Sequence, residues 1–284
     1  HDGHTTMLLG AAKYLAETRN FDGTVNFIFQ PAEEGLGGGD KMVQEGMFDR
    51  FPCDTVWGMH NIPGIPVGNF AVSPGPMMAA RDNFIIKVQG RGSHGAMPQQ
   101  GIDPVVVGAH LVMALQTITS RNIEPQDALV ISVTQFEGGN AFNVVPDSVE
   151  LRGTCRVFDP KVQASLPERI ERIVNGVCAT FGATGTLEYL KGYPATINDP
   201  AQAAVAAEVA EALAGKERVD RNPKPMMGAE DFSYMLNQRP GAYIWAGNGD
   251  TAGVHHPDYD FSDDLLPHGA SFWARLVEDR LPRS

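Results

Sequence analysis

The sequence predicts an α/β fold in which one domain, with a mostly parallel sheet flanked by helices, is interrupted by an inserted ferredoxin-like α+β domain. Helical and strand patterns alternate near both ends of the chain, which is typical of a parallel sheet. The middle of the chain instead shows the element order β-α-β-β-α-β. The 284 residues, 43% of them hydrophobic, are enough for one large domain or two of medium size.

The first domain begins with residues 1–74. Apolar residues at helical spacing between positions 7 and 15 predict a first helix. The stretch TVNFIF at 24–29 predicts a largely buried strand, and residues 55–60 predict the next one. Between these strands a helix is expected, with Asp40 as its N-cap.

The rhythm changes over residues 75–190, which we assign to the inserted domain. This length is comfortable for one domain. The expected elements are a strand at 83–90, a helix at 103–118, strands at 128–136 and 148–158, a helix at 161–181 and a strand at 185–190.

Residues 191–284 return to the α/β pattern and complete the first domain. An alanine-rich helix is expected at 200–213, a short helix at 231–236 and a strand at 242–246. A long loop then leads into a final helix.

The composition excludes some classes of partner. The formal net charge of −12 argues against nucleic acid and against anionic membrane surfaces. The sequence contains no apolar run of about 18 residues, so no transmembrane helix is expected. Cys53, Cys155 and Cys178 show no CxxC spacing, so we expect reduced thiols and a cytoplasmic protein.

Candidate metal ligands follow the predicted strands. Glu33 and Glu34 follow the strand at 24–29, and His60 ends the next. His255 and His256 lie in the loop after the strand at 242–246, and His1 precedes the first helix. Because ligands bind at the carboxyl ends of strands in open parallel sheets, these side chains can meet at one rim. Imidazole and carboxylate ligands suit Zn²⁺, Mn²⁺ or Co²⁺.

Plainer interpretations exist for each of these residues. A lone histidine at a strand end is more often a hydrogen-bonded loop residue, and adjacent glutamates are usually a solvated pair. The gathering of four such segments favours a metal. For His4 we expect packing or support of a ligand rather than ligation. The glycine-rich GLGGGDK lacks the spacing of a phosphate loop and predicts a turn.

Two further motifs carry polar side chains. Glu230 and Asp231, in MMGAEDF, can cap the short helix that follows; support of the site is the weaker alternative. His94, in GRGSHGAMP, follows a strand of the inserted domain and can donate a hydrogen bond to an oxyanion in a facing site. Asn143, in NAFNVVPD, is explained locally by a turn before Pro146.

Several motifs together resemble those of a known family. They are HDGHTTMLLGAA, FQPAEEG, GMHNIPGIPVG, GRGSHGAMPQQGIDPV, NAFNVVPDSVELRGTCRVFD, MMGAEDFSY and VHHPDYDF. In this order they are similar to the M20-type metallo-aminoacylases, and within them to the branch of hippurate hydrolases and auxin-conjugate (IAA-amino acid) hydrolases. The resemblance covers essentially the whole chain.

The resemblance implies a metal-dependent amidohydrolase that cleaves N-acyl-L-amino acids, with two divalent metal ions in its α/β catalytic domain. It implies that Glu33 is the general base. It also implies that the metal ligands are His1, Glu34, His60 and His255.

The inserted domain would then be a lid that mediates a homodimer. His94 on this lid would polarise the substrate carbonyl, and Asn143 matches the substrate-binding asparagine of the family.

In this branch a cysteine two residues before the HDGH histidine also binds the metals, and that position precedes residue 1. We therefore expect the sequence to be the C-terminal part of a longer chain. Alternative functions are an M20-type dipeptidase or carboxypeptidase, a deacetylase of an amino-acid precursor, or a non-catalytic dimeric protein that binds amino-acid conjugates.

Overall fold

The structure is a computed structural model that describes residues 1–283. The chain divides into two compact units. Unit 1 is discontinuous and consists of His1–Met77, Thr196–Met226 and the stretch from Asp231 to the end of the described chain. Unit 2 consists of Met78–Ala195 together with Met227–Glu230.

Unit 1 contains both helices and strands. Its helices are α1 (Asp2–Thr18), α2 (Glu33–Leu36), α3 (Gly38–Gln44), α4 (Met47–Arg50), α7 (Pro200–Ala214), the 3₁₀ turn η2 (Lys216–Arg218), α8 (Ser233–Leu236) and α9 (Leu265–Arg280). Its strands are β1 (Val56–Ile62), β2 (Phe70–Ala71), β10 (Thr196–Asn198), β11 (Val219–Asp220) and β12 (Gly241–Gly247), while β3 (Gly75–Met78) reaches the boundary with unit 2.

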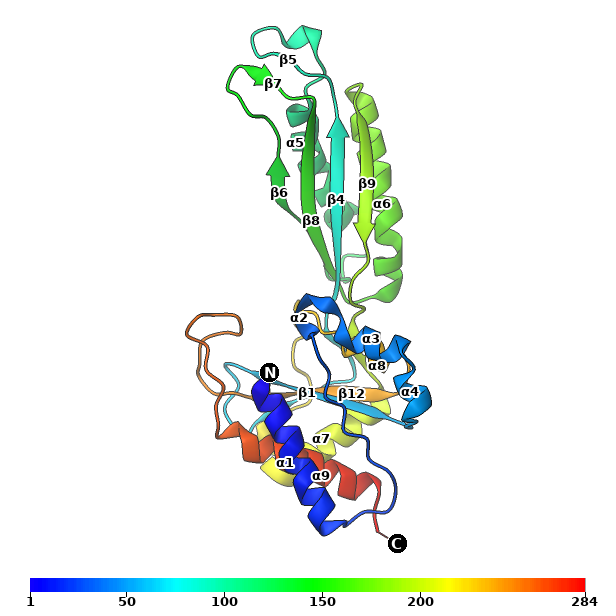
Figure 1. Cartoon of the computed structure of the whole chain (residues 1–284), viewed down its shortest axis with the longest axis vertical. Helices are drawn as coiled ribbons and strands as arrows, with labels where there is room; N and C mark the ends of the chain where they lie inside the picture. The colour runs from blue at the N-terminus through cyan, green and yellow to red at the C-terminus, as the bar shows by residue number, and fades with distance from the viewer. Residues whose placement is uncertain (284) are drawn as a thin grey trace. The chain divides into compact units, whose positions relative to one another are not determined.

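The main sheet of unit 1 has four strands in the order β1-β12-β2-β11. The pairs β1–β12 and β2–β11 are parallel, and β12 and β2 are antiparallel, so the sheet is mixed. Every residue of β12 is buried, and helices lie on both sides of β1 and β12 in Figure 1, with α1, α7 and α9 on one side and α3 and α8 on the other. The predicted α/β class is confirmed.

The strand predicted at 24–29 is wrong. None of these residues is in a strand, and Phe29 is 45% exposed. A strand requires a neighbour that accepts and donates its backbone hydrogen bonds, and no strand among the described residues pairs with this segment. The prediction of Asp40 as an N-cap is also wrong, because α3 begins earlier, after Gly37.

Apolar side chains from distant segments form the core of unit 1. Met7 of α1 packs with Phe272 and Leu276 of α9 and with the interior of the sheet. The rings of Phe70 and Phe272 lie 5.5 Å apart between centroids. Met7 of α1 and Met59 of β1 belong to this core, so the beginning of α1 lies near the end of β1, where the site is found.

Unit 2 has the element order β-α-β-β-α-β in its main sheet and flanking helices. The elements are β4 (Ala80–Gln89), β5 (Ser93–His94), the 3₁₀ turn η1 (Pro98–Gln100), α5 (Pro104–Arg121), β6 (Leu129–Glu137), β7 (Val144–Val145), β8 (Ser148–Val157), α6 (Pro160–Thr180) and β9 (Thr184–Leu190). The sheet is antiparallel, in the order β6-β8-β4-β9.

One face of this sheet is apolar and the other is polar. Alternate residues of β4, among them Phe84, Ile86 and Val88, are buried, as expected when successive side chains point to opposite faces. In Figure 1 both α5 and α6 lie on the same side of the sheet, and buried side chains of these helices, such as Leu111 and Ile170, supply the rest of the core.

Three helices begin with the same two residues, aspartate and proline. Asp103, Asp159 and Asp199 each accept hydrogen bonds from two backbone N–H groups of the first turn of α5, α6 and α7. The proline that follows has no N–H to leave unsatisfied. Among the described residues no helix combines the length and the apolar character needed to cross a membrane.

Candidate metal centre

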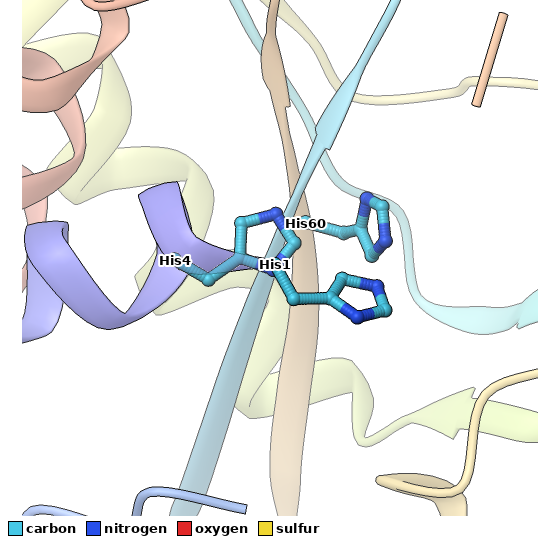
Figure 2. A group of neighbouring side chains, drawn as sticks. All are labelled: His1, His4 and His60. Atoms are coloured by element: carbon cyan, nitrogen blue, oxygen red, sulfur yellow. The ribbon is translucent and has the colours of Figure 1, made fainter. Parts of the chain in front are cut away.

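Three histidines from two elements lie side by side in unit 1 (Figure 2). His1 precedes α1, His4 lies in its first turn, and His60 lies near the carboxyl end of β1. Ring centroids are 5.4 Å apart for His1 and His60 and 4.4 Å apart for His4 and His60. One ring nitrogen of each histidine lies within 4.8 Å of the other two. A spacing of three residues places His1 and His4 on the same side of the helix.

The orientation of His60 is set by its own backbone. Its Nδ1 lies 2.7 Å from the carbonyl oxygen of Asn61. Because a carbonyl oxygen only accepts, Nδ1 carries the proton, and Nε2 keeps its lone pair for a cation.

Asn61 also connects His4 to the loop before α9. The Nε2 of His4 lies 2.7 Å from the side-chain oxygen of Asn61, and the Asn61 amide donates to the hydroxyl of Tyr259 at 2.6 Å. Asn61 is almost completely buried. The sequence analysis did not identify Asn61 or Tyr259, although each lies within four residues of a predicted ligand, in GMHN and HHPDY.

His4 and His60 are both electrically neutral near pH 7. Burial, followed by the nearby His60, lowers the pKa of His4 to about 3. Burial also lowers the pKa of His60. A neutral imidazole offers a lone pair, which is the form that binds metal ions. His4 contacts the side chain of Asn61, whose backbone carbonyl oxygen contacts His60, and a ring nitrogen of His4 also lies within 4.8 Å of one nitrogen of each of the other two rings.

The two adjacent glutamates lie on a turn with irregular backbone. Ala32 adopts a left-handed conformation with φ of 55°, and Glu34 and Gly35 depart from helical angles. This turn brings ligand atoms of His1, Glu33 and Glu34 within 4.8 Å of one another. Glu33 is half-buried, whereas Glu34 is exposed.

His255 approaches the same carboxylates from the loop between β12 and α9. Its Nδ1 lies 3.9 Å from a carboxylate oxygen of Glu34, and its φ is 69°, an uncommon value for a residue other than glycine. The neighbouring His256 instead accepts a hydrogen bond from the backbone of Asp258 at 3.1 Å. Of the two adjacent histidines, His255 is therefore the one that faces Glu34.

The structure thus gathers five of the predicted site residues in one place in unit 1. They are His1, Glu33, Glu34, His60 and His255. Imidazole nitrogen and carboxylate oxygen in this combination fit Zn²⁺, Mn²⁺ or Co²⁺, and the lowered pKa of His60 keeps that ring in its binding form. The residues present therefore fit a site for divalent cations.

His94 and Asn143 belong to unit 2, where they are neighbours at a two-stranded antiparallel sheet formed by β5 and β7. His94 of β5 pairs with Val144 of β7, the residue after Asn143. The backbone N–H of Gly95 donates to the carbonyl of Asn143 at 2.7 Å, and the Nδ1 of His94 accepts from the N–H of Ala96 at 3.1 Å. The imidazole of His94 is exposed.

The chain is similar over its length to curated proteins. It is 39% identical to the hippurate hydrolase of Campylobacter jejuni over 277 residues, 35% identical to an N-acetylcysteine deacetylase of Bacillus subtilis and 37% identical to the IAA-amino acid hydrolase ILR1-like 4 of Arabidopsis thaliana. Each comparison covers 98% of this chain; the chain spans 72% of the first two relatives and 64% of the third.

A solved structure has the same fold. It is the crystal structure of the Bacillus subtilis YXEP protein, described as a dinuclear metal binding peptidase from the M20 family. Its TM-score with this chain is 0.84 at 30% sequence identity. The alignment covers 99% of this chain and 72% of that one.

The family model named Peptidase_M20, for peptidase family M20/M25/M40, matches residues 1–279. This match and the named hydrolases confirm the predicted resemblance and the assignment as a metal-dependent amidohydrolase. The match covers residues 1–279, which include all the gathered histidines and glutamates. The chain therefore belongs to peptidase family M20/M25/M40.

Proposed function

We propose that the protein hydrolyses the amide bond of N-acyl-L-amino acids of the hippurate type, releasing a carboxylic acid and a free amino acid. The observation that carries this proposal is the gathering of His1, Glu34, His60 and His255 in one place, with Glu33 next to His1 and Glu34. Relatives named for hippurate, N-acetylcysteine and IAA-amino acids support the substrate class.

In this proposal His1, Glu34, His60 and His255 would hold two divalent metal ions, zinc, manganese or cobalt. The dinuclear site of the Bacillus subtilis structure supports the number of ions. Metal ions held there would lower the pKa of a bound water to about 7, which would supply a nucleophile near neutral pH.

Glu33 is the proposed general base. Its carboxylate takes a proton from the attacking water and then delivers that proton to the departing amine nitrogen. Glu33 suits this task because it is half-buried and lies beside the ligands. The proton returns to the product, so the carboxylate is regenerated in each cycle.

We assign a lid role to unit 2. His94 donates a hydrogen bond to the developing oxyanion, and Asn143 binds the substrate. The exposure of the His94 ring and its position on β5, which pairs with β7 next to Asn143, support this role. A homodimer formed through unit 2 and a cytoplasmic location stay predictions.

A second candidate is deacetylation of a modified amino acid, which the N-acetylcysteine deacetylase relative favours. The two candidates differ in the acyl group, so a substrate panel separates them. We would assay the full-length protein against N-benzoyl, N-acetyl and N-indoleacetyl amino acids, with Mn²⁺ or Zn²⁺ and with a chelator. Hydrolysis that a chelator abolishes and metal restores is expected; no turnover by metal-loaded protein would reject the proposal.

The base is tested with Glu33→Gln. This variant should keep its metal content, because Glu33 is not a proposed ligand, and lose a factor of about 10²–10⁴ in kcat. Glu17→Gln, which changes an exposed glutamate of α1, is the matched control and should retain full activity. If Glu33→Gln retains more than about a tenth of the wild-type kcat, the role of base belongs elsewhere.

A further inference from the structure

A buried carboxylate that the proposed chemistry does not use lies in unit 1. Asp231 is 0% exposed. One of its carboxylate oxygens accepts a hydrogen bond from the backbone N–H of Gly39 at 2.7 Å, and the other accepts from the side-chain amide of Gln30. A buried carboxylate without such donors would be costly, so these contacts form part of the packed interior.

The two donors bracket the segment that carries the proposed base and one proposed ligand. Glu33 and Glu34 lie between Gln30 and Gly39, and neither end of this segment belongs to a strand. Its backbone is irregular, with positive φ at Ala32, Gly35 and Gly37. A regular ladder of backbone hydrogen bonds therefore does not fix its path, and other contacts must do so.

The segment closes on itself by close contacts that only glycine permits. A Cβ atom at Gly38 would lie 1.7 Å from the carbonyl oxygen of Pro31, and one at Gly39 would lie 2.8 Å from the backbone oxygen of Asp231. The glycine-rich GLGGGDK, which runs from the end of α2 into α3, thus packs against Asp231 at Gly39. Both Gly38 and Gly39 are buried.

Asp231 itself is held by the framework of unit 1. Its backbone carbonyl accepts a hydrogen bond from Tyr234 at 3.1 Å, at the beginning of α8. Its side chain does not cap this helix, as the sequence had suggested, because it is turned toward the segment 30–39. A carboxylate oxygen of Asp231 also lies within 4.8 Å of one of Glu33.

We propose that Asp231 is a positioning residue, which sets the places of Glu33 and Glu34 by holding both ends of segment 30–39. This inference rests on the proposed function, since it takes Glu33 as the base and Glu34 as a ligand. A base displaced by about 1 Å can cost on the order of 10²-fold in rate. The anchor thus makes an irregular segment precise enough for catalysis.

The test compares two substitutions of Asp231 in the full-length protein. Asp231→Ala removes both acceptors. Asp231→Asn keeps an oxygen for the N–H of Gly39, and the amide of Gln30 can rotate to present its own oxygen to the new NH₂ group. Gln30→Ala removes one of the two attachments and serves if Asp231→Ala does not fold. Asp82→Ala, which removes a comparably buried aspartate of unit 2, is the control for a loss of stability alone.

Two measurements are made on each variant. Amide hydrogen exchange of residues 31–44 in metal-free protein reports whether the segment is held, independently of any catalysis. Metal content, kcat and KM with the best N-acyl amino acid report its effect on the site. If the wild-type protein hydrolyses none of these substrates, the proposed function fails while the exchange measurement still tests the anchor.

Asp231→Ala should speed exchange of residues 31–44 and lower kcat by about 10–100-fold, with KM changed by less than about threefold. Gln30→Ala should do the same to a smaller extent. Asp231→Asn should restore slow exchange and most of kcat, and Asp82→Ala should leave exchange of 31–44 and kcat unchanged.

Three results would overturn the inference. Unchanged exchange in Asp231→Ala would show that the segment is held without the anchor. A lower melting temperature with normal kcat would make Asp231 structural only. Loss of bound metal in Asp231→Asn as severe as in Asp231→Ala would make the charge, and not the hydrogen bonds, the essential feature.

Discussion

Two buried aspartates, one in each unit, accept the same kinds of hydrogen bond but connect different parts of the chain. Asp82 in unit 2 and Asp231 in unit 1 are 2% and 0% exposed, and each accepts hydrogen bonds from a glutamine amide and from a glycine N–H. The donors to Asp82 come from Gln163 of helix α6 and from Gly192, which follows β9. The donors to Asp231, Gln30 and Gly39 of α3, lie on either side of the irregular turn that carries Glu33 and Glu34. A carboxylate that joins regular elements adds stability; one that holds an irregular turn can place functional groups.

The surroundings of Asp82 show how completely it is paired. Besides Gln163 and the N–H of Gly192, it accepts a hydrogen bond from the hydroxyl of Tyr189 at 2.7 Å. Burial, and then the Asp82 carboxylate, raises the pKa of the Cys155 thiol to about 12. Burial is also the main reason why the pKa of Tyr189 is raised. This cluster joins β4, α6 and β9 and lies outside the proposed chemistry.

The largest effect is expected from Asp82→Ala. It removes the acceptor of the buried Gln163 amide and one acceptor of the partly buried Tyr189 hydroxyl, and should lower the free energy of unfolding by about 3 kcal/mol. Urea unfolding measures this loss, and hydrogen exchange locates it in unit 2. Asp127→Ala, at an exposed position of the same unit, should change the free energy by less than about 0.5 kcal/mol. A loss below about 1 kcal/mol for Asp82→Ala would remove the contrast between the units.

Unit 1 should respond to acid through its partly buried histidines, His4 and His60. Between pH 6.5 and about 3 the unfolded chain binds a proton at His4 that the folded protein excludes. The contribution of His4 to the free energy of unfolding of metal-free protein is therefore fully present above pH 6.5. It decreases as the pH falls, by up to about 1.4 kcal/mol per pH unit for one such histidine. His60, whose pKa is also lowered, adds to the slope.

Urea unfolding of chelator-treated protein between pH 7.5 and 5 measures how the free energy of unfolding depends on pH. His4→Asn should reduce this dependence, because one of the two excluded protons is then absent. A stability that does not change over this range, or a slope that His4→Asn leaves intact, would mean that these rings are not buried as neutral groups.

The smallest effect is expected from Tyr189→Phe. It removes one donor to Asp82 while the other donors remain, and should cost about 1 kcal/mol of unfolding free energy. Tyr14→Phe, at a residue of unit 1 that is 46% exposed with a hydrogen bond of 3.3 Å to Glu278, is the matched control and should cost less. If urea titration shows that Tyr189→Phe and Tyr14→Phe lose equal unfolding free energy, the importance assigned to burial is contradicted.

Elements with strong local signals were predicted well. The helices α5, α6 and α7 begin at Asp-Pro pairs, and β4 alternates between buried and more exposed residues along its length. These signals act between residues that are close in sequence, through capping hydrogen bonds and side-chain periodicity.

The segment 24–29 shows the limit of such signals. Its apolar, β-branched residues favour a strand, but a strand also depends on a neighbour that no local pattern specifies. The short strands β2, β10 and β11 were missed for the converse reason. They contain two or three residues each and depend on pairing with segments far away in the sequence.

By itself the sequence determined the α/β class, the main helices and the residue types able to bind a metal. Only the tertiary structure placed the His255 ring beside Glu34, connected His4 to Tyr259 through Asn61, and brought Asp231 into hydrogen-bonding contact with Gln30 and Gly39. The last two depend on contacts between residues 198 and 201 positions apart. Capping and periodicity act over a few residues, whereas contacts at such separations exist only after the whole core has packed.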